Sequence, residues 1–234
     1  MNEHISSAYD RDLEKIQALI MKMGGLVEHA ILEGAKALEA RDIEAAEVVR
    51  KADKIIDALE EEINEEAART IALRAPVSKD LRTLLSVLKL ASSLERVGDY
   101  AKNMAKRTSV LAEMKPINGT DAALRRMGKE VQAMLRDVLD AYVRSDVDLA
   151  ENVRQRDLEV DQMYNALFRE FLTFMMEDPR NITACMHMHF IAKNVERMGD
   201  LVTNMAEQVI YMVTGEMPDE DRPKGDKTSS MLTE

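Results

Sequence analysis

Apolar residues recur every three or four positions along most of this chain, in six long stretches. That spacing is typical of helices that bury one face. In the first stretch the apolar positions are Leu13, Ile16, Ile20, Met23, Val27, Ile31, Ala35 and Leu38. They predict a helix over about residues 7–40. Asp42 is a residue type that caps helix N-termini, and the pattern after it predicts a second helix to about residue 71.

Breaks in the apolar pattern place the remaining helices. Pro76 ends the second pattern, since proline cannot continue a helix, and Ser78 or Asp80 is expected to cap a third helix that runs to about Glu113. The turn-forming stretch 115–119 lies near the midpoint and reads as a linker. Three further patterns predict helices at about 120–144, 146–177 and 181–214.

The second half of the chain repeats the first. Residues 94–99, Leu-Glu-Arg-Val-Gly-Asp, return 101 positions later as Val-Glu-Arg-Met-Gly-Asp. The acidic residues Asp42, Asp53 and Asp57 return 104 positions later as Asp146, Asp157 and Asp161. The offset falls from 104 to 101 because the second half is three residues shorter around residues 178–180. We therefore predict an all-α protein of two tandem three-helix bundles, six long helices in all, related by internal duplication and packed about a pseudo-twofold axis. The expected domains are residues 1–115 and 120–216, followed by a polar tail, 217–234, without regular structure.

Composition and charge narrow the function classes. Aromatic residues are few and Trp is absent, as in helices packed on helices. A net charge of -11 argues against nucleic acid as a direct partner and suits cations or basic protein surfaces. The single cysteine, Cys185, excludes an internal disulfide. We see no signal peptide and no apolar run of the roughly 18 residues that a membrane span needs, so a soluble, cytoplasmic protein is expected.

Each copy of the repeated motif sets acidic and amide side chains on one helical face. The positions i, i+4 and i+8 are Glu95, Asp99 and Asn103 in one copy and Glu196, Asp200 and Asn204 in the other. Two carboxylates four apart repel by about 0.2–0.5 kcal/mol, and a glycine in the same turn costs about 1 kcal/mol relative to alanine. The chain carries both costs twice. We therefore expect a compensating partner at this face.

A second acidic pair lies on the preceding helix of each half, Asp53/Asp57 and Asp157/Asp161. If the two helices pack antiparallel, each pair can converge with the motif. Carboxylate and amide oxygens suit magnesium, manganese, calcium or non-haem iron, which makes these residues candidate metal ligands. The alternative is ordinary exposed helix surface.

Arg96 and Arg197, within the motif, have two interpretations. They form ion pairs with neighbouring acids, or they orient the carboxylates from outside the metal site.

Catalytic signatures are missing from the sequence. It has no Glu-x-x-His, no His-Glu-x-x-His, no phosphate-binding glycine loop and no recognisable nucleophile. His187 and His189 are two apart on a predicted helix, so their side chains point in different directions and do not share a metal. We do not expect an enzyme. The alternatives kept open are a metal-dependent phosphohydrolase and a purely structural helical scaffold.

The duplicated motif, together with Asp80-Leu81-Arg82 and Met23-Gly24, resembles the PhoU family of phosphate-specific transport accessory proteins. The resemblance covers about residues 5–215. It implies a six-helix, pseudo-twofold fold, and a protein that represses the phosphate-starvation response when phosphate is plentiful. The implied partners are the ATP-binding subunit of the Pst phosphate transporter, the PhoR sensor histidine kinase and a second copy of the chain.

The resemblance also implies metal binding through Glu/Asp-x-x-x-Asp motifs, with Mg, Mn, Fe or Zn as the ion. Carried over residue by residue, it assigns metal ligation to the carboxylates named above, most directly to those of the two motif copies. Arg96, Asn103, Arg197 and Asn204 would support them as motif residues. The second half departs from the family pattern at residues 178–180, where Asp-Pro-Arg lacks the leucine of Asp-Leu-Arg, so Arg180 is not assigned as the counterpart of Arg82.

Overall fold

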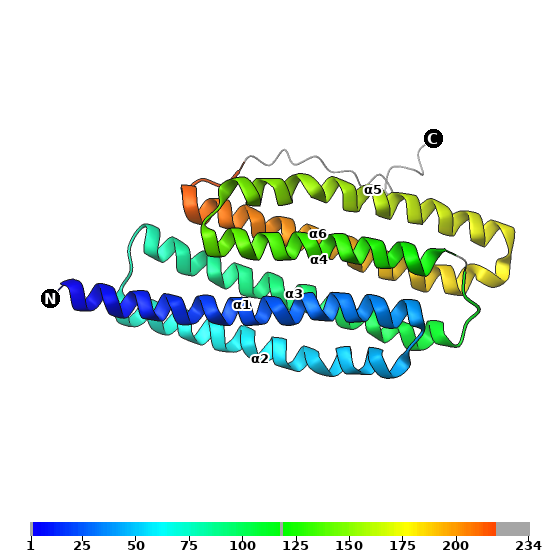
Figure 1. Ribbon diagram of the computed structural model, residues 1–234, viewed down its shortest axis with the longest axis horizontal. Helices are drawn as coiled ribbons and strands as arrows, with labels where there is room; N and C mark the ends of the chain where they lie inside the picture. The colour runs from blue at the N-terminus through cyan, green and yellow to red at the C-terminus, as the bar shows by residue number, and fades with distance from the viewer. Residues whose placement is uncertain (1, 118, 219–234) are drawn as a thin grey trace.

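The computed structural model describes residues 2–117 and 119–218, which form six long α-helices and one short 3-10 helix (Figure 1). The elements are α1 (Asn2–Ala40), α2 (Ile43–Arg74), α3 (Lys79–Ala112), α4 (Thr120–Arg144), α5 (Val147–Glu177), η1 (Pro179–Asn181) and α6 (Ile182–Thr214). No strand occurs in these described ranges, and the all-α prediction is confirmed. The predicted irregular tail falls, from residue 219 onward, outside the described residues.

The six helices pack as two similar sets of three. α1, α2 and α3 contact one another, and so do α4, α5 and α6. α1 also lies against α4, and α3 against α6, so the two sets share one elongated helical body (Figure 1). The prediction of two three-helix bundles in tandem is confirmed.

α3 and α6 run antiparallel through the centre. Near the end of α3, Arg107 contacts His187 near the start of α6, while Arg82 near the start of α3 donates a hydrogen bond to the carbonyl of Met212 near the end of α6. This register brings the middle of α3 level with the middle of α6. The two copies of the repeated motif therefore lie at the same level of the molecule.

Local sequence signals explain where several helices begin. Asp42 accepts a hydrogen bond from the amide of Ala45, and Asp146 accepts one from the amide of Leu149, so both are N-caps. α3 begins directly after Ser78, but the Ser78 side chain makes no capping hydrogen bond and its φ is 51°. The expected cap is therefore correct in position and wrong in mechanism.

Helices α1 and α4 cross closely at Gly24. A Cβ on Gly24 would lie 2.4 Å from Cδ1 of Leu139 on α4, whereas a Cβ on Gly25 would meet nothing within 4 Å. Gly24 therefore lets the two halves approach closely, because any side chain there would overlap the α4 core residue.

Candidate functional site

The glycine of each motif lets an acidic side chain from the preceding helix lie against it. A Cβ on Gly98 of α3 would lie 3.1 Å from Cδ1 of Ile56 and 3.7 Å from Oδ1 of Asp53, both on α2. In the second half, a Cβ on Gly199 of α6 would lie 3.2 Å from Cγ1 of Val160 and 3.4 Å from Oδ1 of Asp157 on α5. Ile56 and Asp53 precede Val160 and Asp157 by the same 104 positions. The motif glycine therefore serves close helix packing in both halves.

In the first half the two acidic pairs do converge. The pKa of Glu95 is raised by burial and then by Asp99, with Asp57 and Asp53 adding to the effect. The pKa of Asp57 is raised by burial and then by Asp53, with a further contribution from Asp99. Carboxylates on α2 and α3 therefore destabilise one another's charged forms across the interface.

The compensating charge in the first half is a lysine of α3. The ammonium of Lys102 lies 2.5 Å from Oδ2 of Asp53 and 2.5 Å from Oδ1 of Asp99. It thereby bridges α2 and α3, and its pKa is raised by these two carboxylates against the opposing effect of its own burial. Lys102 was not among the residues predicted from the sequence, although it follows Asp99 by three positions, a spacing at which opposite charges meet on a helix.

The second half neutralises its motif differently. Thr203 stands where the duplication would place the counterpart of Lys102; it is buried, and its hydroxyl has no hydrogen-bond partner among the described residues. Here Lys193, three residues before Glu196, lies with its ammonium 2.8 Å from Oε1 of that carboxylate. The acids are also more deeply placed, since Asp157, Asp161 and Glu196 are all buried.

The fit to a metal ion differs between the halves. In the first half the Lys102 ammonium occupies the position between Asp53 and Asp99, so these residues as arranged do not fit a cation. In the second half no ammonium comes from that position, because Thr203 is uncharged. Within residues 2–117 and 119–218, no three His, Cys, Asp or Glu side chains are grouped so that they could hold a metal ion.

The remaining motif residues lie outside these clusters. Arg96, Arg197, Asn103 and Asn204 are all exposed. In the part of the chain that the structure describes, neither arginine forms an ion pair with the motif carboxylates. The histidines 187 and 189 have separate surroundings, as expected: His187 contacts Arg107, and His189 lies among the rings of Tyr164, Phe168 and Phe190.

A groove with basic side chains lies between α3 and α6, beside the first motif. It has a volume of about 400 Å³. We call it the basic groove, and its lining consists of Asn103, Lys106, Arg107, Val110, His187 and Asn194. Of these residues the motif identified only Asn103.

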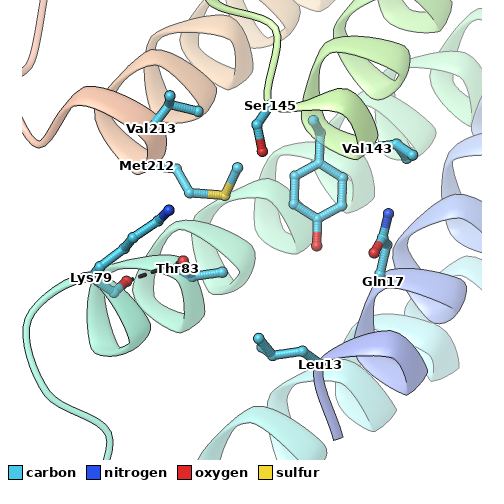
Figure 2. Close-up of a pocket in the computed structure, with 9 residues that line it drawn as sticks. Leu13, Gln17, Lys79, Thr83, Val143, Ser145, Met212 and Val213 are labelled. Carbon is cyan, nitrogen blue, oxygen red and sulfur yellow. Dashed lines mark hydrogen bonds between the residues drawn. The ribbon is translucent and has the colours of Figure 1, made fainter. Parts of the chain in front are cut away.

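A second cavity of about 170 Å³ lies among α1, α3, α4 and α6, at the far end of the α3–α6 pair (Figure 2). Its lining mixes apolar and uncharged polar side chains with one cation, Lys79, whose backbone carbonyl accepts a hydrogen bond from Thr83. Tyr142 also lines it, and burial raises the pKa of that phenol to about 12. The hydroxyl therefore stays protonated at neutral pH.

None of the described helices is long and apolar enough to span a bilayer.

Comparison with known proteins gives one consistent result. The PhoU domain family matches residues 20–108 and 124–209, one segment in each half. The chain is 46% identical to the phosphate-specific transport system accessory protein PhoU homolog of Caulobacter vibrioides, over 98% of this chain and 100% of the relative. It is 43% identical to the homolog of Rhizobium meliloti, over 97% and 96% of the two chains.

Solved structures agree with the sequence relatives. The crystal structure of PhoU from Pseudomonas aeruginosa superimposes with a TM-score of 0.86 at 38% identity, covering 89% of this chain and 100% of that one. The crystal structure of the phosphate transport system regulatory protein PhoU from Streptococcus pneumoniae gives 0.84 at 31% identity, with 90% and 99% coverage.

Proposed function

This chain belongs to the PhoU family, and we propose that it is a non-enzymatic negative regulator of the phosphate-starvation response. A role in the regulation of phosphate transport follows from relatives that match along nearly the whole chain. The observation that carries the finer proposal is that the PhoU domain matches both repeats, residues 20–108 in the first half and 124–209 in the second.

The proposed mechanism is that of an adaptor. The chain would contact the ATP-binding subunit of the Pst transporter and the PhoR histidine kinase, and hold them in a signalling-off state at high phosphate. Such a protein needs no turnover, only a higher affinity for one state of its partners. We place this adaptor and its partners in the cytoplasm. A homodimer of the chain would present each partner-binding surface twice.

The lysine-bridged acidic cluster of the first half supports an adaptor over a metal-dependent phosphohydrolase. A hydrolytic metal needs an open coordination position and a water that a base can activate. In the first half the position between Asp53 and Asp99 holds the Lys102 ammonium instead, which joins α2 to α3. This arrangement favours a fixed helical surface for docking.

Metal binding, with Mg, Mn, Fe or Zn as the ion, is proposed for the second half alone. The carboxylates available are Asp157, Asp161, Glu196 and Asp200. Support comes from the chemistry of these oxygen donors and from the neutral Thr203 at the position where the first half carries Lys102. Bound there, an ion would add positive charge to that of the Lys193 ammonium, which lies 2.8 Å from Oε1 of Glu196.

Deletion of the gene tests the regulatory proposal. Alkaline phosphatase activity, a reporter of the phosphate-starvation response, should rise in phosphate-rich medium when the chain is removed, and should fall again on complementation. Low reporter activity in the deletion strain would refute the proposal.

A further inference from the structure

The basic groove between α3 and α6 combines several hydrogen-bond donors with positive charge. We propose that it is a binding site for inorganic phosphate. This site rests on the proposed function, because phosphate binding would let a regulator of the phosphate-starvation response sense phosphate directly.

The groove has two walls, and each is one helical face. Asn103, Lys106, Arg107 and Val110 follow the spacing i, i+3, i+4, i+7 on α3, and His187 and Asn194 are seven apart on α6. Such spacings place side chains on one side of a helix. Because α3 and α6 are antiparallel and in contact, these two faces border one space.

The groove is positive within an acidic protein. None of its lining residues is acidic, and neither Lys106 nor Arg107 forms an ion pair with a carboxylate in the described ranges. The chain as a whole carries a net charge of -11. The local positive charge therefore attracts anions to this part of the surface. The planar guanidinium of arginine can donate two parallel hydrogen bonds to two oxygens of one phosphate.

Arg107 is held in place before any ligand arrives. Its Nη1 lies 3.2 Å from Nδ1 of His187, and its guanidinium lies 4.5 Å from the centre of the Phe190 ring. Arginine can only donate hydrogen bonds, so Nδ1 accepts and the imidazole proton resides on Nε2. His187 then retains an N–H donor for an anion. A guanidinium already fixed loses less conformational entropy on binding.

The duplication provides an internal comparison. The positions equivalent to the six lining residues are Asn204, Glu207, Gln208, Tyr211, Ser86 and Ser93. The amide is retained, but the pair Lys106-Arg107 is replaced by Glu207-Gln208, and Glu207 pairs with Arg154 at 3.5 Å. The positive groove is therefore a property of one end of the α3–α6 pair and not of the repeated scaffold.

The dimensions favour a small anion over an extended acidic segment. The α3 residues of the groove span seven positions, which is about 10 Å along a helix. A volume of about 400 Å³ lies within the range of small-ligand sites. An acidic peptide would need a row of cations beyond these two, whereas one tetrahedral ion can meet Lys106, Arg107 and the neighbouring amides together.

Calorimetric titration of the full chain with inorganic phosphate, at constant ionic strength, tests the proposal. Lys106→Gln should weaken binding by about tenfold, because a charge-assisted hydrogen bond is lost. Lys106→Glu with Arg107→Gln, which copies the residues of the other end, should weaken it by about a hundredfold or more. The matched control is Arg126→Gln with Lys129→Gln, which removes two exposed cations of α4 and should leave the affinity unchanged.

Several results would overturn the proposal. They are no phosphate binding by the wild-type chain, an equal loss in the α4 control, or binding of glycerol 3-phosphate or polyglutamate without binding of phosphate. Lys106 is exposed, so the single variant stays informative if the double variant fails to fold. The proposed function is tested separately. If deletion raises the phosphate-starvation response but the chain does not bind phosphate, only the phosphate site is refuted. If the chain binds phosphate but deletion leaves the response low, only the regulatory function is refuted.

Discussion

Replacing Lys102 by methionine removes the cation that bridges α2 and α3 while keeping the length of its apolar stem. In the wild type this ammonium contacts Asp53 and Asp99 at 2.5 Å each. Asp53 is buried, and its Oδ1 has no hydrogen-bond partner in the described part of the chain. In the variant a buried carboxylate therefore loses its counter-ion.

The expected loss of stability lies between two reference cases. Removing one partner of a fully buried pair costs about 3–5 kcal/mol, and an exposed pair is worth about 0.2–1 kcal/mol. The Lys102 side chain is 34% exposed, Asp99 42% and Asp53 6%. An intermediate loss of about 1–3 kcal/mol follows, which lowers the melting temperature of a domain of this size by about 2–12 °C.

Urea unfolding followed by circular dichroism at pH 7 measures this loss. Lys129→Met, an exposed lysine of α4, is the control and should change the free energy of unfolding by less than about 0.5 kcal/mol. Adding Asp53→Asn to Lys102→Met removes the uncompensated charge, so the double-mutant cycle should give a coupling energy of about 1 kcal/mol or more. A Lys102→Met variant as stable as the control, or no coupling to Asp53, would refute the assignment of Lys102 as the compensating partner.

Three further measurements concern Glu95, the glycine pair of α1 and the bound metal. Glu95→Gln should stabilise the protein by about 0.2–0.5 kcal/mol at pH 7, because it removes a repelling carboxylate. The pKa of Glu95 is raised in the folded state, so the folded wild type takes up a proton and recovers stability as the pH falls toward the ordinary value of 4.5. Urea unfolding should therefore show that the stability difference between Glu95→Gln and the wild type shrinks over that pH range. Gly25→Ala should raise the free energy of unfolding by about 0.5–1 kcal/mol, because a Cβ there meets nothing. Gly24→Ala, whose Cβ would overlap Leu139, should be less stable than Gly25→Ala by about 1–3 kcal/mol in the same assay. Equal stabilities of the two variants would contradict the close α1–α4 crossing. Elemental analysis after gentle purification should show less bound metal in Glu196→Ala and no change in Glu95→Ala; a loss in Glu95→Ala alone would reverse the assignment to the second half.

The sequence predicted the helices well because each carries its own periodic signal. The starts of α2 and α5 were predicted from Asp42 and its repeat Asp146, and the structure shows both as side-chain caps. The cap at Ser78 was wrong in mechanism, since its backbone adopts a positive φ instead of the extended conformation in which a serine caps.

The site was predictable only in part, because its partners come from other helices. The duplication identified the carboxylates and glycines, and the mutual repulsion of the carboxylates indicated that they have a compensating partner without showing which residue it is. Lys102 reaches Asp53 across 49 positions of sequence, and a contact of that kind depends on how α2 and α3 pack. The basic groove was missed for the same reason: Arg107 and His187 are 80 positions apart and meet only through the antiparallel packing of α3 and α6.

The adaptor proposal is tested most directly by capture of the affinity-tagged chain from cells grown in phosphate-rich medium, with quantification of the Pst ATP-binding subunit and PhoR in the captured material. Both proteins should be enriched over an untagged strain, and both should decline when the cells are starved of phosphate. Capture of neither partner in phosphate-rich medium would contradict it.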